Sequence, residues 1–223
     1  MRGFRLDHVA RFGGIAFVVL AFGGFMGAGD AGFDDGVKIA AYVAEHRDRI
    51  LIGTHLAAIG LLFFVLWSWW IMNAIDRIND QLDNLGLAIL VAAAVTAAVE
   101  FGVIALYMTL ALISNHPVDP QIARALANAY SVFSYVDYFP LAVFFLAFGI
   151  AALRTRIVGA WVGWTAIVFV PATLIAAAPG LGLDWPVGLP AFAWVCAANI
   201  ALVRSKRLAG NNSGVPSTSR PPG

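Results

Sequence analysis

The segment from Leu85 to Ser114 reads LGLAILVAAAVTAAVEFGVIALYMTLALIS and carries a single charged residue, Glu100. A transmembrane helix needs about 20 mostly apolar residues to cross about 30 Å of hydrocarbon. This segment exceeds that length, and its many alanine and leucine residues favour a helix. It therefore predicts a membrane-spanning α-helix.

Further apolar segments approach or exceed the same length. Across the 223 residues, 61% are hydrophobic and 12% are charged, whereas soluble domains are about 45–50% apolar and about 25% charged. We therefore expect an all-α fold, a polytopic transmembrane helical bundle of about six spans. The expected spans are residues 12–29, 50–75, 85–114, 131–153, 157–178 and 187–203.

These spans make one transmembrane domain, residues 1–208. The remaining residues, 209–223, are rich in Gly, Ser, Asn and Pro, and such a composition buries too little apolar surface to fold. We expect residues 209–223 to form a disordered cytoplasmic tail.

The basic residues indicate an orientation. Alternate loops place ten of the 14 lysines and arginines on the side of the amino terminus and four on the other. The excess of positive charge marks the cytoplasmic side, so both termini are expected in the cytoplasm. The first span also resembles a cleaved signal peptide, but a retained helix gives the even number of spans that this charge distribution favours.

Two connections on the opposite side carry helix-start signals. Asp34 or Asp35 can cap a helix through Val37, and Asp119 precedes Pro120, which pairs an N-cap acid with a proline in the first turn. Small apolar residues follow each signal at helical spacing. The pattern predicts two short external amphipathic helices.

The order of these features resembles a known family. An acid-capped external helix with AAY at 40–42 is followed by HRDR at 46–49, and LRTR at 153–156 is followed by WVGW at 161–164. This order resembles a widespread bacterial family of six-helix membrane proteins classed as a domain of unknown function, over residues 10–205. The resemblance implies the six-helix fold and a bacterial plasma membrane, and it implies no activity.

Two carboxyl groups fall inside the predicted spans. Ionisable residues in hydrocarbon are costly and usually face a cavity or a partner. Glu100 shares one face of its helix with Thr96 and Tyr107, since offsets of four and seven residues differ by about 40° or less at 100° per residue. Asp137 lies on the next span, and consecutive helices are usually neighbours.

Counting about 1.5 Å per residue from the expected helix ends places Tyr107, Asp137 and His55 at one depth. Glu100 is then expected roughly 10 Å deeper. We expect an outward-facing polar site of Glu100, Asp137, Tyr107, His55 and Thr96, with a proton or a small molecule as ligand. The alternative is that these groups only hold helices together through hydrogen bonds.

The residues that several other kinds of functional site require are absent from the sequence or lie outside the predicted spans. Lys38 and Lys206 lie outside the spans, so no lysine is placed for a Schiff base, and neither a phosphate-binding glycine loop nor a His-Glu-x-x-His zinc motif occurs. His55 and His116 are poorly placed to ligate haem, and Cys196 is the only cysteine. We expect no cofactor, no metal and no nucleic-acid partner.

The sequence thus favours a small transporter, ligand binder or sensor surrounded by membrane lipids. One alternative is an intramembrane enzyme acting on a lipid-like substrate, with Asp137, His55 and Glu100 as acid and base groups. Another is a structural or accessory membrane subunit. The oligomeric state does not follow from the sequence.

Overall fold

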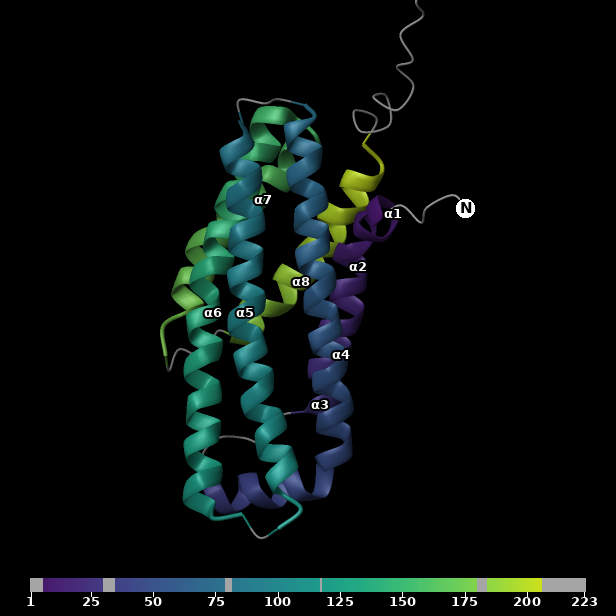
Figure 1. Cartoon of the computed structure of the whole chain (residues 1–223). Coiled ribbons are helices and arrows are strands. Elements are labelled where there is room, and N and C mark those ends of the chain that lie inside the picture. The colour runs from purple at the N-terminus through teal and green to yellow at the C-terminus, as the bar shows by residue number, and fades with distance from the viewer. Residues whose placement is uncertain (1–5, 30–34, 79–81, 117, 180–183, 206–223) are drawn as a thin grey trace, which may run out of the picture.

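The structure is a computed structural model that describes residues 6–29, 35–78, 82–116, 118–179 and 184–205. Within these ranges the regular elements are all helical (Figure 1). The elements are α1 (Leu6–Arg11), α2 (Gly13–Phe17), a π-helical turn η1 (Val18–Phe22), α3 (Gly23–Ala28), α4 (Gly36–Asp76), α5 (Asp83–Ile113), α6 (Pro120–Thr155), α7 (Ala160–Ala176) and α8 (Asp184–Val203).

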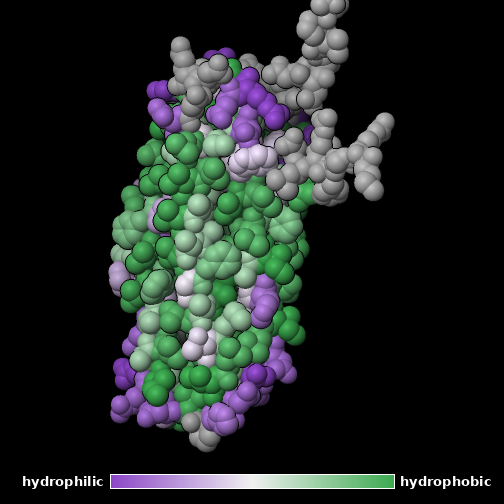
Figure 2. Space-filling model, viewed as in Figure 1, coloured by the Kyte–Doolittle hydropathy of each residue, from purple (hydrophilic) through white to green (hydrophobic). Residues whose placement is uncertain are grey.

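Four of the described helices are long and apolar enough to cross a membrane: α4, α5, α6 and α8. Two more apolar helical stretches, Gly13–Ala28 and Ala160–Ala176, are shorter. Large apolar side chains also cover the outside of the bundle, for example Val19, Ile52 and Val168, each more than 60% exposed. Figure 2 shows the result as a broad hydrophobic band between two hydrophilic ends.

Soluble monomers rarely expose a continuous apolar surface of this extent. The chain is therefore a helical membrane protein, and the expected all-α bundle is confirmed at that level. The predicted apolar segments match described helices to within a few residues at most ends. The predicted tail, residues 209–223, lies outside the described residues.

The first predicted external helix is the beginning of α4. The Asp35 side chain accepts a hydrogen bond from the backbone N–H of Val37 at 2.9 Å, which satisfies a donor that the first turn leaves free. Asp34, the other predicted cap, lies outside the described residues. The helix is interrupted at His46, whose φ of −109° and ψ of 16° are not helical. The part before His46 lies across the lower end of the bundle in Figure 1.

The second external helix differs from the prediction. Asp119 caps it as expected, accepting from the N–H of Gln121 at 2.7 Å, but the helix then continues to Thr155 as α6. A helix of 36 residues is about 54 Å long, so it extends well beyond the hydrocarbon. Its early turns are helical like the rest because residues 120–130 contain no helix-breaking residue after Pro120.

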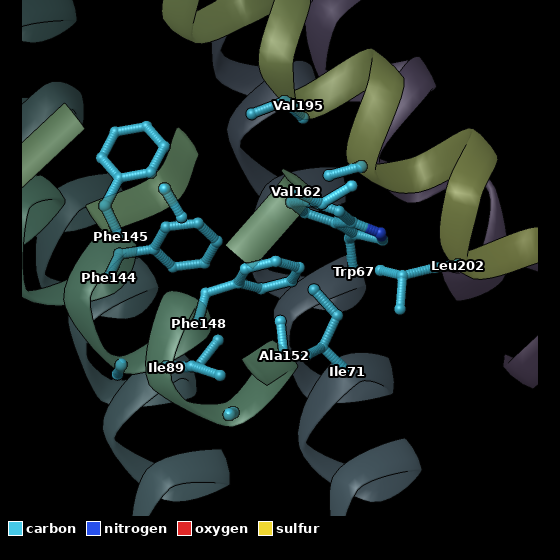
Figure 3. Close-up of a cluster of buried hydrophobic side chains, with 14 of the residues drawn as sticks. Trp67, Ile71, Ile89, Phe144, Phe145, Phe148, Ala152, Val162, Val195 and Leu202 are labelled. Atoms are coloured by element: carbon cyan, nitrogen blue, oxygen red, sulfur yellow. The ribbon is translucent and has the colours of Figure 1, made fainter. Parts of the chain in front are cut away.

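An aromatic core joins five helices in the upper part of the bundle. Trp67 of α4 contacts Phe144 and Phe148 of α6, with ring centroids 6.2 and 6.5 Å apart. Trp194 of α8 packs edge-on against Phe148 at 5.0 Å. Figure 3 shows Trp67, Phe144 and Phe148 in one cluster with Ile89 of α5 and Val162 of α7. Such interlocking rings fix how α6, α7 and α8 dock against α4.

The first apolar helix crosses α4 at very short range because both contribute glycines. A Cβ on Gly24 would overlap the carbonyl oxygen of Gly53, and a Cβ on Gly60 would lie 2.6 Å from the backbone nitrogen of Ala21. No side chain fits at these points. Small residues that let backbones approach are typical of membrane helix pairs.

Asn199 of α8 supplies hydrogen-bond partners where the first apolar helix is interrupted. In a regular helix the N–H of Ile15 would bond to the carbonyl of Arg11, but the backbone turns at Phe12, between α1 and α2. The Asn199 amide takes both groups: its Nδ2 donates to the Arg11 carbonyl at 2.8 Å, and its Oδ1 accepts from the Ile15 N–H at 3.0 Å. Asn199 is fully buried, so α8 and the start of the first apolar helix are held together away from water.

The helix α7 is too short to cover all of α6, since it has 17 residues against 36. Phe145 of α6 stacks on Phe169 of α7 at 5.0 Å, and a Cβ on Gly149 would lie 3.0 Å from the Gly163 carbonyl. The two helices are antiparallel, so α7 ends beside the turn of α6 that contains Asp137. In Figure 1 the α7–α8 pair accordingly covers only the upper part of the bundle.

We predict that Asn199→Leu lowers the free energy of unfolding by about 1–3 kcal/mol, because a buried donor and a buried acceptor lose their partner. Hydrogen exchange at the Ile15 amide should accelerate in the same variant. Asn128→Leu is the matched control, since Asn128 is exposed on α6. Unchanged exchange at Ile15 in Asn199→Leu would show that the bridge does not form.

Candidate functional site: a carboxyl pair between two helices

Two contacts set the register of α5 against α6. A Cβ on Gly102 would lie 3.2 Å from the ring of Phe133, and the rings of Tyr107 and Tyr130 are 5.4 Å apart. The helices run in opposite directions, so each step toward the start of α5 matches a step toward the end of α6. This register brings Glu100 level with Asp137.

The Glu100 and Asp137 side chains are hydrogen-bonded to each other. Asp137 is 7% exposed, and Glu100 is partly buried. A carboxylate can only accept, so a hydrogen bond between two carboxyl groups requires that at least one of them carries a proton. The two carboxyl groups can therefore be joined in this way only when the pair holds a proton.

The pair has no basic partner in the apolar part of the protein. Residues 50–75, 85–113, 131–153, 160–176 and 187–203 contain no lysine or arginine. Placing charge in a low-dielectric interior is expensive unless it is compensated. Only protons or a bound cation can supply that compensation here.

One carboxyl oxygen of Asp137 is free to make a further interaction. Its Oδ1 atom is buried and has no hydrogen-bond partner, although leaving a buried polar atom unpaired costs about 1–3 kcal/mol. The site is therefore equipped to accept one more interaction than the chain itself provides.

Thr96 lies one helical turn from Glu100 and is also unpaired. Six threonines fall in the described ranges, and five of them donate to a backbone carbonyl three or four residues earlier: Thr54, Thr109, Thr155, Thr165 and Thr173. Thr96 is 5% exposed, and its hydroxyl has no partner. Its Cβ is expected about 5–6 Å from that of Glu100, on the same face.

Tyr107 belongs to a different layer. It lies seven residues after Glu100, about 10 Å along α5 toward the lower end, where its hydroxyl donates to the Gly29 carbonyl at 3.2 Å. The depth estimate from sequence had put Tyr107 beside Asp137 and Glu100 deeper. The structure differs because α6 begins at Pro120 and not near Ser131, which shifts its register against α5.

His55 faces away from the pair. Its side chain is exposed on the outside of α4, and its Nδ1 lies 2.7 Å from the Leu51 carbonyl of the same helix. The structure thus brings together Glu100 and Asp137, with Thr96 on the adjoining turn, and places Tyr107 and His55 elsewhere. The described residues include no group of three or more His, Cys, Asp or Glu side chains placed to hold a metal ion.

The direct pairing of the two carboxyl groups was missed by reasoning from sequence. Tyr107 and Tyr130 offer a usable signal, because aligning these aromatics across the hairpin also aligns Glu100 with Asp137. That alignment requires a continuous helix from Pro120, which the sequence permits but does not require. Comparisons with protein-family models, curated proteins and solved structures found no match to this chain.

We predict that infrared spectra of the protein in lipid nanodiscs contain the absorption of a protonated carboxyl group near neutral pH. The band should change in Glu100→Gln and in Asp137→Asn, because each variant removes one member of the pair. Asp48→Asn is the control, since Asp48 is exposed and pairs with Arg47 at 3.1 Å. A band that is absent from the wild type, or untouched in both variants, would contradict the shared proton.

Proposed function

We propose that this chain is a small membrane transporter or ligand-binding protein in which the Glu100–Asp137 pair gains and loses a proton as its ligand binds. The observation that carries the proposal is a carboxyl pair that shares a hydrogen bond and has no basic residue in the apolar segments to neutralise it. Such intramembrane acids are typical of proton relays and ion pathways.

The position of the pair supports access from one side. Beyond Asp137, toward the lower end in Figure 1, α6 continues without the cover of α7 and α8. The aromatic core of Trp67, Phe144 and Trp194 lies on the other side of the pair, toward the upper end. A proton or ligand therefore meets less packed protein on the way to the lower end than to the upper end.

We further propose that the chain crosses a bacterial plasma membrane six times, with both termini in the cytoplasm. The two shorter apolar stretches, Gly13–Ala28 and Ala160–Ala176, supply the two additional crossings, since tilt and local thinning of the bilayer accommodate short helices. In Figure 1, α1 and the end of α8 lie at the same end of the bundle, as an even number of crossings requires.

The hydrogen bond by itself also fits an accessory subunit in which the pair only fastens α5 to α6. A variant that keeps the hydrogen bond but cannot take up a proton distinguishes that role from the proposed one. Glu100→Gln can still donate to Asp137, so a fastening role tolerates it and proton exchange does not.

We predict that proteoliposomes carrying the wild-type chain relax an imposed pH gradient faster than empty liposomes, when the same mixture of salts, sugars and amino acids is on both sides. The rate in Glu100→Gln should fall to that of empty liposomes, because an amide does not titrate. An internal pH dye measures the rate. Glu45→Gln is the matched control, since Glu45 is exposed at the lower end.

Two results would refute proton exchange at this pair. One is a wild-type rate equal to that of empty liposomes. The other is a folded Glu100→Gln variant that keeps the wild-type rate, which would favour the fastening role.

The topology has its own test. In a Cys196→Ser background, cysteines replacing Ser205 and Asn115 should be labelled by an impermeant thiol reagent from opposite sides of the membrane. Ser205 should react only after the cytoplasmic face is opened, and Asn115 should react in intact cells. Labelling of both from one side would exclude six crossings with cytoplasmic termini.

A further inference from the structure

We infer that Glu100, Asp137 and Thr96 form a binding site for a hard monovalent cation such as Na⁺, which enters in exchange for one proton of the pair. The inference rests on the proposed function and names the ligand of the same site. It depends on two observations beyond the acidic pair itself, the unpaired Asp137 Oδ1 atom and the unpaired Thr96 hydroxyl.

Both unpaired oxygens belong to side chains that are more than nine-tenths buried. While its carboxyl group is ionised, Asp137 Oδ1 cannot donate a hydrogen bond. It can only accept one or coordinate a cation. The Thr96 hydroxyl has given up the backbone hydrogen bond that every other threonine in the described ranges makes. A cation coordinated by these oxygens would supply the interaction that each of them lacks.

The donor atoms select the class of ion. Carboxylate and hydroxyl oxygens are hard ligands, which suit alkali and alkaline-earth ions rather than copper, zinc or iron. Cys196 lies on α8 and His55 faces outward from α4, and no cluster of three or more His, Cys, Asp or Glu side chains occurs in the described part of the chain.

Charge balance favours a monovalent ion. When one Na⁺ enters and one proton leaves to water, the net charge of the site stays the same, and no other group has to ionise in the low-dielectric interior. A divalent ion would need two protons to leave for the same balance. One proton for one alkali ion is therefore the least costly exchange.

The end of α7 adds a favourable field. By its register with α6, α7 ends beside the turn that contains Asp137. The carboxyl end of a helix carries partial negative charge on its last carbonyl groups, which favours a nearby cation. This partial negative charge attracts a cation, as the two carboxyl groups do.

Few other groups could account for a proton released at this site. The elements packed on α5 and α6 are chiefly α4, α5, α6 and α7. Between Ile50 and Ile75, α4 offers only the outward-facing His55, and α7 carries no titratable side chain. Tyr107 of α5 is bonded to Gly29, and besides Asp137 α6 adds the phenols of Tyr130, Tyr135 and Tyr138.

The test measures proton release from the wild-type protein in nanodiscs in weakly buffered solution at neutral pH. NaCl should release on the order of one proton per chain and raise the unfolding temperature, because it binds only the folded state. N-methylglucamine chloride at equal ionic strength should do neither. Asp137→Asn should abolish the release.

Thr96→Val separates the cation site from the carboxyl pair. It should weaken Na⁺ binding by roughly tenfold or more, since a charge-assisted contact is lost, while the infrared band of the protonated carboxyl group remains. Thr109→Val on the same helix is the matched control, because Thr109 is exposed and bonded to Ala105. If Thr96→Val fails to fold, Thr96→Ser should keep the wild-type affinity.

The outcomes distinguish this inference from the proposed function. No effect of NaCl on a wild-type protein that keeps its carboxyl band and its proton flux overturns the cation site alone. The cation site is also overturned if CaCl₂ acts and NaCl does not, or if Thr96→Val binds Na⁺ as tightly as the wild type. Absence of both the band and the flux overturns the proposed function as well.

Discussion

The absence of water from the hydrocarbon controls how this protein is built. Inside the bilayer a polar group finds its hydrogen-bond partner within the chain or remains unpaired. Most polar side chains in the spans meet this requirement locally, as five of the six described threonines do by bonding to their own backbone. Asn199 meets it at longer range. Its side chain binds the backbone carbonyl and the backbone N–H that the interruption at Phe12 leaves without helical partners.

The Glu100–Asp137 pair is a different solution to the same constraint. Each carboxyl group is the other's partner, and a proton substitutes for the basic residue that the spans do not contain. The solution is incomplete, because Asp137 Oδ1 and the Thr96 hydroxyl remain unpaired on adjoining turns. Trp67 Nε1 is also buried without a partner, but it lies in the aromatic core and can only donate. Unpaired acceptors gather at the pair, and that is where a cation or proton can be bound.

Packing determines where this pair sits. Above it, large rings from α4, α6 and α8 interlock and leave the helices little freedom to separate. Below it, a smaller cluster around Ile39, Val43 and Tyr107 joins the early part of α4 to α5 and α6. The pair lies between these two cores, beside the end of α7. At the level of the pair a third cluster of Ala57, Leu61, Ala97 and Ile104 packs α4 against α5.

Reasoning from the residues alone was enough to predict the helical membrane fold, most helix ends, a cap at Asp34 or Asp35, the Asp119 cap and the two carboxyl groups worth examining. These features depend on local composition and on the cost of charge in hydrocarbon. It was not enough to predict which candidate residues meet. His55 and Tyr107 shared the right depth by counting, yet the outward face of α4 and the early start of α6 separate them from the pair. Rotation about a helix axis and the register between helices depend on contacts such as Gly102 with Phe133 and Tyr107 with Tyr130. Those contacts exist only in the folded chain, since residues far apart in the sequence make them.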